Sequence, residues 1–265
     1  MEKIKFVDTT LRDGEQTPGV VFSESEKIML AQKMELLKVD IIEVGIPAIG
    51  KKERAVIKKI INLNLEAKIL LWNRMKIEDI DLSLSCGAKN IHLSAPVSNL
   101  QLEVKLKKEK SQLLAEMTEA IKYAKTAGCL VSIGAEDASR AEKSFLFEYL
   151  KTAENAGAER FRYADTVGIL EPFSTFNMLK EIRSKTEMEI EFHAHNDFGL
   201  AVANSLAAWR AGADYISSTI TGIGERAGNT DFKEFVEAYN YFYGQQLNFD
   251  WEIYQKLLSK MKMAL

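Results

Sequence analysis

The stretch Glu189–Asp197, EIEFHAHND, places two of the three histidines of this chain at the end of an apolar run. Side chains at positions i and i+2 of a strand point to the same face, so His193 and His195 converge on one point. Imidazoles are good ligands for divalent metals, and two of them leave a coordination shell incomplete. The stretch therefore predicts a strand that ends at a metal site. A pair of hydrogen-bonded core histidines is the alternative.

Apolar runs of this kind alternate with helical patterns along the whole sequence. The predicted strands are Ile4–Thr10, Ile41–Gly45, Ala67–Trp72, Asn90–Ser94, Leu130–Gly134, Arg160–Ala164, Glu189–His195 and Tyr215–Thr221. Between and after them, helices are predicted from Ser23 and over Lys51–Leu63, Ile77–Ser85, Leu106–Ala127, Ser144–Ala156, Pro172–Lys185, Leu200–Ala211 and Phe232–Tyr239. Eight βα units predict an α/β fold, the (β/α)8 TIM barrel, with a doubly wound open sheet as the competing arrangement.

One further helix is predicted after the eighth unit, over Trp251–Met263. We expect a barrel domain at residues 1–245 and a C-terminal helical extension at 246–265. The helix has an apolar stripe of Tyr254, Leu257, Leu258 and Met261. This stripe predicts packing under the barrel or against a partner chain, and it makes a monomer less favoured.

The composition narrows the class of protein. With 265 residues, 46% hydrophobic and 28% charged, the chain is typical of a globular domain, and a net charge of −3 gives no reason to expect nucleic acid or an anionic membrane as a partner. The start of the chain has no apolar targeting segment and no run approaches the length of a membrane span, which predicts a cytoplasmic protein. Cys86 and Cys129 are expected to be reduced, structural thiols.

Polar and charged residues gather where the predicted strands end. In a barrel these ends form the face that carries the active site. The segments concerned are DTTLRDGEQ (8–16), EVGIP (43–47), GAEDASR (134–140), YADTVG (163–168), HAHND (193–197) and TGIGERAGN (221–229). Their clustering predicts a charged pocket at this face, centred on a metal.

Asp13 is the best-placed third ligand, because it follows the first strand directly. Two histidines and one carboxylate leave open positions for substrate. Arg12 beside it needs a negative partner, either a bound carboxylate or a salt bridge to Glu43 or Asp8. His92 lies inside the fourth strand, where a structural and a substrate-lining role are equally expected. The match of GIGERAG to a dinucleotide fingerprint is discounted, because no strand follows it to bind the ribose.

The six segments together resemble the DRE-TIM metallolyase superfamily over about residues 4–240. Within it, the chain is similar to the Claisen-condensing acyltransferases homocitrate synthase, isopropylmalate synthase and citramalate synthase. VSIGAEDASRAE and FRYADTVGILEPF are most similar to the homocitrate synthases associated with nitrogen fixation. The resemblance implies condensation of acetyl-CoA, the co-substrate, with a 2-oxo acid; 2-oxoglutarate, which gives homocitrate and CoA, is the favoured one.

The resemblance also implies roles for individual residues. It implies that Asp13, His193 and His195 bind one divalent metal ion (Zn, Mn or Mg) with Asn229 close to it, and that Arg12 and Glu136 are catalytic. It implies that Gln16, Thr166 and Glu136 line the same pocket. We also expect Glu43, Arg74, Lys76 and His92 to bind substrate, and the glycine-rich loop with Gly222, Gly224, Glu225 and Arg226 to bind acetyl-CoA.

Two departures from the family pattern leave alternatives open. Homocitrate synthases carry a carboxylate-binding arginine on the fifth strand where this chain has Ser132, so Arg74 or Lys76 is expected to replace it and isopropylmalate or citramalate synthesis stays possible. Family members continue past the barrel into helical subdomains, whereas this chain stops at Leu265. We therefore expect a homo-oligomer or a second subunit that supplies this part. A 3-hydroxy-3-methylglutaryl-CoA lyase and a non-catalytic regulatory subunit are the remaining alternatives.

Overall fold

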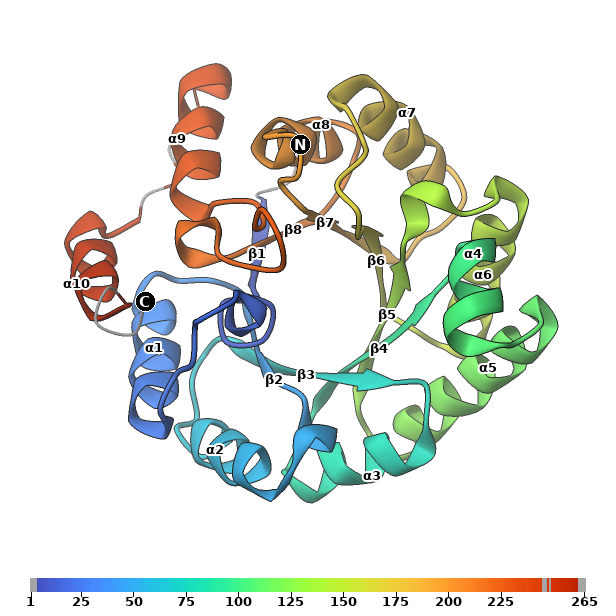
Figure 1. The fold of residues 1–265 in the computed structure, drawn as a ribbon, viewed down its shortest axis with the longest axis horizontal. Coiled ribbons are helices and arrows are strands. Elements are labelled where there is room, and N and C mark those ends of the chain that lie inside the picture. Colours follow the sequence, from blue (N-terminus) through green and yellow to red (C-terminus); the bar gives the residue numbers. More distant parts are fainter. Residues whose placement is uncertain (1–3, 245–246, 248, 262–265) are drawn as a thin grey trace.

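The computed structural model describes residues 4–244, 247 and 249–261. Its eight parallel strands form a closed barrel in the order of the sequence, β1 to β8, which confirms the predicted fold and excludes an open sheet (Figure 1). The strands are β1 (Lys5–Asp8), β2 (Ile41–Gly45), β3 (Lys68–Arg74), β4 (Asn90–Pro96), β5 (Leu130–Glu136), β6 (Arg160–Asp165), β7 (Glu189–Ala194) and β8 (Tyr215–Ser218).

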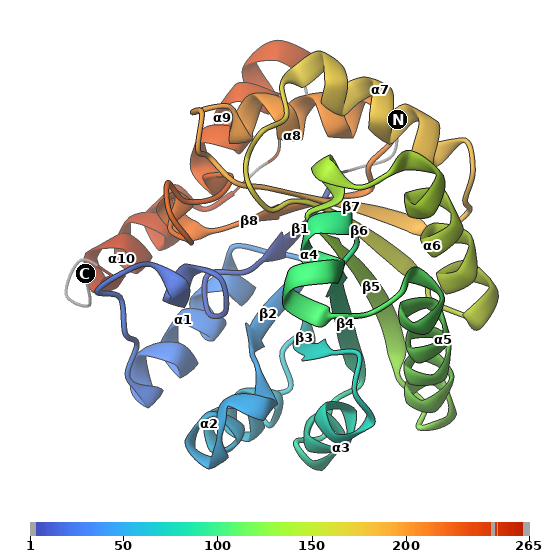
Figure 2. The same cartoon turned by 45° about the vertical axis from the view of Figure 1, so that its right-hand side comes forward.

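Helices surround the barrel and cover the outer face of its strands (Figure 2). They are α1 (Glu24–Leu36), α2 (Lys51–Ile61), α3 (Ile77–Ser85), α4 (Asn99–Gln101), α5 (Lys110–Thr126), α6 (Lys143–Ala156), α7 (Pro172–Arg183), α8 (Ala201–Arg210), α9 (Phe232–Tyr243) and α10 (Trp251–Met261). The predicted start of α1 is confirmed, because Ser23 and Glu26 form a reciprocal capping box.

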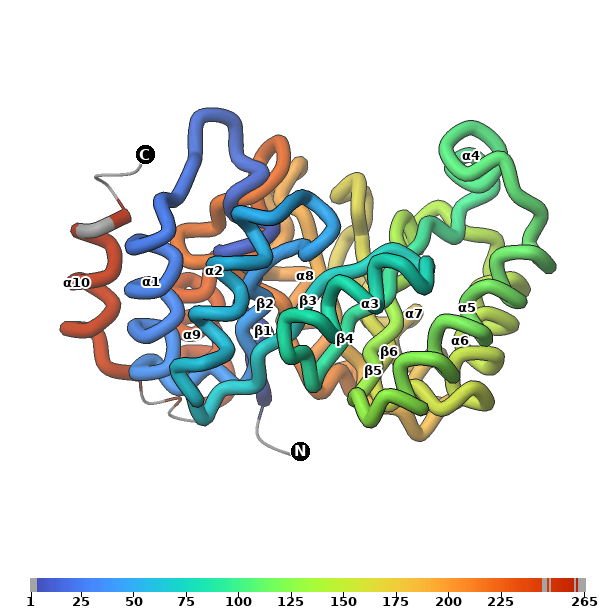
Figure 3. Tube along the Cα trace, turned by 90° about the horizontal axis from the view of Figure 1, so that it is seen from below, coloured from blue at the N-terminus to red at the C-terminus, as the bar shows by residue number. Residues whose placement is uncertain are grey.

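The connection between β4 and α5 differs from the sequence prediction. The helix expected from Leu106 begins only at Lys110, and the short helix α4 and a π-helical turn over Leu102–Leu106 precede it. The left-handed φ of 53° at Lys107 ends the turn. Figure 3 shows α4 projecting from the barrel on the side opposite the N-terminus, which is the side where the strands end.

The C-terminal helix belongs to the layer of helices around the barrel. In Figure 1, α10 lies beside α1, and Tyr254, Leu257 and Met261 are buried. The Tyr254 ring stacks on Phe232 of α9. The apolar stripe of α10 is thus buried against α9 and α1 of the same chain. Residues 262 and 263 of the predicted helix and the proposed domain boundary at 245–246 lie outside the described residues.

The interior of the barrel holds both apolar and charged side chains. A small apolar cluster, separate from the large core under the helices, is formed by Val7, Ile41, Leu70 and Tyr215.

Cys86 and Cys129 are buried free thiols in the large core under the helices. Among the described helices, none is long and apolar enough to cross a membrane.

Candidate active site

A cavity of about 240 Å³ opens at the face where the strands end. Eight of the proposed site residues line it: Arg12, Asp13, Gln16, His92, Glu136, Thr166, His193 and His195, together with Glu225 of the proposed acetyl-CoA loop. These residues are spread along the sequence from Arg12 to Glu225. The closure of the barrel is what brings them together, because β1 pairs with β8.

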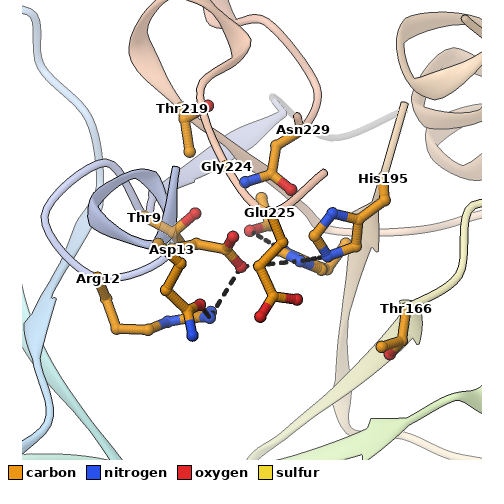
Figure 4. A network of polar contacts seen from close by, with 12 residues as sticks. Thr9, Arg12, Asp13, Thr166, His195, Thr219, Gly224, Glu225 and Asn229 are labelled. Atoms are coloured by element: carbon orange, nitrogen blue, oxygen red, sulfur yellow. Dashed lines mark hydrogen bonds and ion pairs between the residues drawn. The ribbon is translucent and has the colours of Figure 1, made fainter. Parts of the chain in front are cut away.

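Three side chains of this cavity have the geometry of a metal site. Ligand atoms of Asp13, His193 and His195 lie within 4.8 Å of one another, and all three residues are buried. The Nε2 atoms of the two histidines are 3.3 Å apart, and Asp13 Oδ2 is 3.3 Å from His193 Nε2 (Figure 4). Ser217 Oγ lies 2.8 Å from His193 Nδ1 and fixes that ring. Two imidazole nitrogens and a carboxylate oxygen therefore point at one common position.

The electrostatics of the three groups suit a cation. Burial and the neighbouring His193 lower the pKa of His195 to about 4, so this imidazole is neutral at neutral pH. Burial opposes ionisation of Asp13, but Arg12 and His193 hold the pKa of the carboxyl well below its ordinary value. Asp13 Oδ1 is buried without a hydrogen-bond partner among the described residues, as is His195 Nδ1. A carboxylate beside two imidazoles is a donor set that fits a divalent ion.

Arg12 is held by acidic groups on two sides. Its Nη1 lies 2.8 Å from Asp13 Oδ2, and its Nε donates to Glu43. Glu43 is one of the partners that the sequence offered for Arg12. Glu43 in turn accepts from Arg162 Nη2 at 2.5 Å. The guanidinium at the cavity is thus anchored to the inside of the barrel.

This anchor continues as a buried chain of ion pairs. Arg162 Nε lies 2.6 Å from Glu191 Oε1, and Arg160 Nε lies 3.0 Å from Glu191 Oε2. Both carboxylates of the chain are fully buried. Burial raises the pKa of Glu43, but Arg12 and Arg162 more than offset this and hold it at about 2. The chain stays ionised because each charge faces opposite charges.

Glu136 lies at the end of β5, on another wall of the cavity. Lys105 Nζ is 3.2 Å from Glu136 Oε2. Lys105 belongs to the π-helical turn that precedes α5, so this irregular segment reaches over the cavity mouth. Among the carboxylates that line the cavity, Glu136 and Glu225 are outside the Asp13 cluster.

The glycine-rich loop after β8 is folded on itself. A Cβ on Gly228 would lie 2.1 Å from Gly222 O, and one on Gly224 would lie 2.3 Å from Asn229 Nδ2. These glycines are therefore required by the packing of the loop. Asn229 donates to Ile223 O, while its Oδ1 is buried without a partner among the described residues. Asn229 is close to His195, with which it forms an isolated β-bridge (Figure 4).

Arg226 connects this loop to its neighbours. Its guanidinium donates to both carboxylate oxygens of Asp197 and to Thr166 O. Thr166 Oγ1 accepts from the Asp137 amide at 2.8 Å. Gln16 lies near Arg12, with 3.4 Å between Oε1 and Nη1. Arg226 thus links the loop to the segments that follow β6 and β7.

The structure does not bring three of the proposed substrate-binding residues to the cavity. Arg74 is directed to α3, where its Nε and Nη2 donate to Asp79 at 2.7 and 2.8 Å. Lys76 caps the start of α3 and is not among the cavity-lining residues. Glu43 is fully buried and is not among the cavity-lining residues, and it forms ion pairs with Arg12 and Arg162. We expected Arg74 or Lys76 to replace a strand-five arginine, but neither residue lines this cavity.

Several cavity residues were missed by the sequence reasoning. They are Trp72, Ser94, Gln101, Lys105, Arg162 and Ala164. Trp72 and Ser94 end the third and fourth predicted strands, which contribute none of the six polar segments, and Arg162 lies inside the sixth predicted strand. The signal that could have found them is the period of two: Arg160, Arg162 and Ala164 alternate with apolar residues and so point inward. Gln101 and Lys105 lie in the irregular segment that the sequence assigned in part to a helix.

The protein is a (β/α)8 barrel with a buried His-His-Asp cluster that could hold a metal ion. The chain matches the HMGL-like family over residues 3–253, and it belongs to that family. This confirms the family that the six segments predicted.

The curated relatives are named as synthases. The chain is 45% identical over 261 residues to 2-isopropylmalate synthase 2 of Caldanaerobacter subterraneus, a match that covers 98% of this chain and 68% of that protein. It is 45% identical over 244 residues to homocitrate synthase subunit alpha of Clostridium pasteurianum, covering 92% and 91%. It is 43% identical over 250 residues to homocitrate synthase 1 of Nostoc sp., covering 94% of this chain and 66% of that protein.

Solved structures share the fold. The HMG-CoA lyase of Bacillus subtilis superposes with a TM-score of 0.86 at 17% sequence identity, covering 99% of this chain and 93% of that one. At this level of identity the likeness shows the barrel alone.

Proposed function

We propose that this protein is an acyltransferase that condenses acetyl-CoA with a 2-oxo acid, with 2-oxoglutarate as the favoured substrate and homocitrate and CoA as products. The observation that supports this most is the meeting of Asp13, His193, His195 and Arg12 in one cavity. A 2-oxo acid offers a carboxylate and a keto oxygen side by side, which suit a cation and a guanidinium. The relatives named homocitrate and isopropylmalate synthases agree with this choice.

The donor set supports one divalent metal, held by Asp13, His193 and His195. The unpartnered Asp13 Oδ1 and the converging Nε2 atoms are the features that fit it. Asn229, with its unpartnered Oδ1, lies close by. Such an ion supplies Lewis-acid polarisation of a keto group, an effect of several kcal/mol.

The side chains of the protein have separate tasks in this reaction. Arg12 donates hydrogen bonds to the keto oxygen and stabilises the alkoxide that forms there. Glu136 is positioned to accept a proton from the methyl group of acetyl-CoA, with Lys105 holding the carboxylate in place. The resulting enolate attacks the keto carbon, and the alkoxide takes up the proton that Glu136 received. Water then cleaves the thioester to release CoA. Gln16 and Thr166, which also line the cavity, orient the acid.

The acetyl-CoA site is proposed to include the loop with Gly222, Gly224, Glu225 and Arg226, of which Glu225 lines the cavity. We propose that the protein works as a homo-oligomer or with a second subunit. The relative named subunit alpha supports this, because the match covers 91% of it whereas it covers 68% and 66% of two other synthases. A cytoplasmic location and a role in nitrogen fixation are part of the same proposal.

A thiol-release assay tests the reaction. The metal-loaded protein is incubated with acetyl-CoA and a panel of 2-oxo acids, with and without the polypeptide encoded beside it. CoA release that depends on a 2-oxo acid is expected. Asp13→Ala should abolish it, whereas Asp81→Ala, which alters an exposed carboxylate on α3, should not. No release under either condition would contradict the proposed function.

A further inference from the structure

Asp137, in the segment GAEDASR (134–140), is fully buried where β5 ends. It follows Glu136 directly and is not among the residues that line the cavity. Its backbone has the left-handed conformation, with a φ of 57° and a ψ of 34°. Residues other than glycine adopt this conformation rarely, although aspartate and asparagine do so more often than most. A fully buried carboxylate at such a position requires several partners, because an uncompensated charge in the interior is costly.

The carboxylate of Asp137 has partners on two sides. Arg140 donates to it twice, with Nε 2.8 Å from Oδ1 and Nη2 2.7 Å from Oδ2. Ser98, which follows β4, donates its hydroxyl to Oδ2. The bidentate pair with Arg140 fixes the orientation of the carboxylate, because both oxygens are held by one planar group. The carboxylate therefore presents Oδ2 to Ser98 in a fixed direction.

Ser98 connects this carboxylate to the cavity-mouth segment, which comprises α4 and the π-helical turn (residues 99–106). Its Oγ accepts from the Gln101 amide at 3.3 Å, so Ser98 caps α4. Gln101 and Lys105 of the segment line the cavity, and Lys105 Nζ lies 3.2 Å from Glu136 Oε2. The segment that holds the Glu136 carboxylate is thus attached to the residue next to Glu136.

The backbone at Asp137 joins the ends of three neighbouring strands. The Asp137 amide donates at 2.8 Å to the hydroxyl of Thr166, which follows β6. The amide of Val97, which follows β4, donates to Glu136 O at 2.9 Å. Glu136 is the last residue of β5, so its backbone is held from both sides. These contacts fix the direction in which the Glu136 side chain leaves the strand.

We propose that Asp137 is a positioning residue that holds the cavity-mouth segment through Ser98 and so aims Glu136 at the methyl group of acetyl-CoA. This inference rests on the proposed function, in which Glu136 accepts a proton from that group. Asp137 does not line the cavity, so it acts through Glu136 and Lys105. A displacement of about 1 Å can slow a reaction about a hundredfold, so a loose segment should impair turnover while 2-oxo acids still bind.

Two substitutions at position 137 separate the carboxylate from the backbone conformation. Asp137→Gly permits the left-handed conformation but removes the carboxylate, whereas Asp137→Asn tolerates that conformation and keeps one accepting oxygen. We expect turnover per binding site to fall at least about tenfold in Asp137→Gly and to be intermediate in Asp137→Asn. Asn64→Gly is the matched control and should leave turnover unchanged. Asn64 has a φ of 51° in the exposed connection between α2 and β3, and it does not line the cavity.

Turnover per binding site is obtained from two measurements on the same metal-loaded preparation. CoA release is measured with the 2-oxo acid that gives the highest rate in the panel assay, and calorimetric titration with that acid counts the binding sites. A merely structural defect lowers both quantities in parallel, so their ratio stays constant. A misplaced Glu136 lowers the ratio, while the affinity for the 2-oxo acid stays unchanged. A wild-type ratio in Asp137→Gly would overturn the positioning role.

Hydrogen–deuterium exchange tests the attachment of the cavity-mouth segment without turnover. Ser98→Ala leaves the pair of Asp137 and Arg140 intact but removes the hydroxyl that connects it to α4. Amides of residues 99–106 should exchange faster in Ser98→Ala and in Asp137→Gly than in the wild type, and at the wild-type rate in Asn64→Gly. Unchanged exchange in both variants would overturn the inference.

The outcomes separate this inference from the proposed function. If the wild type releases CoA and Asp137→Gly keeps the wild-type ratio, the positioning role is wrong and the proposed reaction stands. If the wild type releases no CoA with any 2-oxo acid, with or without the neighbouring polypeptide, the proposed function fails, and the positioning role fails with it.

Discussion

The substitution Glu43→Gln tests whether the buried chain of ion pairs stabilises the barrel. Glu43 is fully buried between Arg12 and Arg162, and the exchange removes its charge while keeping its shape. Two guanidinium groups then remain in the barrel with one carboxylate fewer. Breaking a buried ion pair in this way typically destabilises a protein by about 3–5 kcal/mol.

The pKa of Glu43 gives an independent magnitude. Its value of about 2, against an ordinary value of 4.5, is a difference of about 2.5 pKa units. At about 1.36 kcal/mol per unit, this corresponds to about 3 kcal/mol of folding free energy. Because the folded-state pKa is lowered, this stabilisation is present in full above the unfolded pKa and is lost as the pH falls from about 4.5 toward 2.

Urea unfolding at pH 7.5, followed by circular dichroism, measures the effect. Glu43→Gln should lower the free energy of unfolding by about 3 kcal/mol. The matched control is Glu24→Gln, which breaks an ion pair with Lys59 that is about half exposed, and it should change the value by less than about 1 kcal/mol. If the free energy of unfolding of Glu43→Gln is within about 1 kcal/mol of the wild-type value, the buried chain of ion pairs does not stabilise the barrel.

Three further predictions concern the cavity and the strand before it. Asp13→Ala and His195→Ala should each abolish turnover and metal binding, the latter measured by elemental analysis of the purified protein. The circular dichroism spectrum should stay native. Full activity in both variants would rule out the metal site. Arg12→Lys should reduce kcat at least about a hundredfold, because an ammonium does not reproduce the guanidinium fork that Glu43 and Asp13 hold, and undiminished turnover would contradict the role of Arg12. Burial raises the pKa of Asp8 to about 7, so its contribution to stability falls as the pH rises from about 4 to about 7 and is constant above. Asp8→Asn should flatten that part of a melting-temperature profile, and an unchanged slope would be evidence against a neutral Asp8.

Much of the site followed from local patterns. The i, i+2 spacing of His193 and His195 depends only on strand geometry, and the structure places their Nε2 atoms 3.3 Å apart. Asp13 was placed beside them from its position just after the first strand, which the closure of the barrel bears out geometrically. The same kind of reasoning was wrong for Arg74, which was expected at the cavity. It ends β3, but its side chain turns to Asp79 of α3, a partner that strand periodicity does not indicate.

The sequence by itself determined the eight βα units, the direction of the strands and the face that holds the charged residues. These features depend on periods of two and of about 3.6 residues and on short turns, all of which are local. Only the tertiary structure decided that α10 packs between α9 and α1. It also decided that Lys105 reaches the cavity from a π-helical turn. It also decided that Gly134 packs against His92. The physical reason is that these contacts depend on the register between strands far apart in the chain and on how side chains share one closed interior.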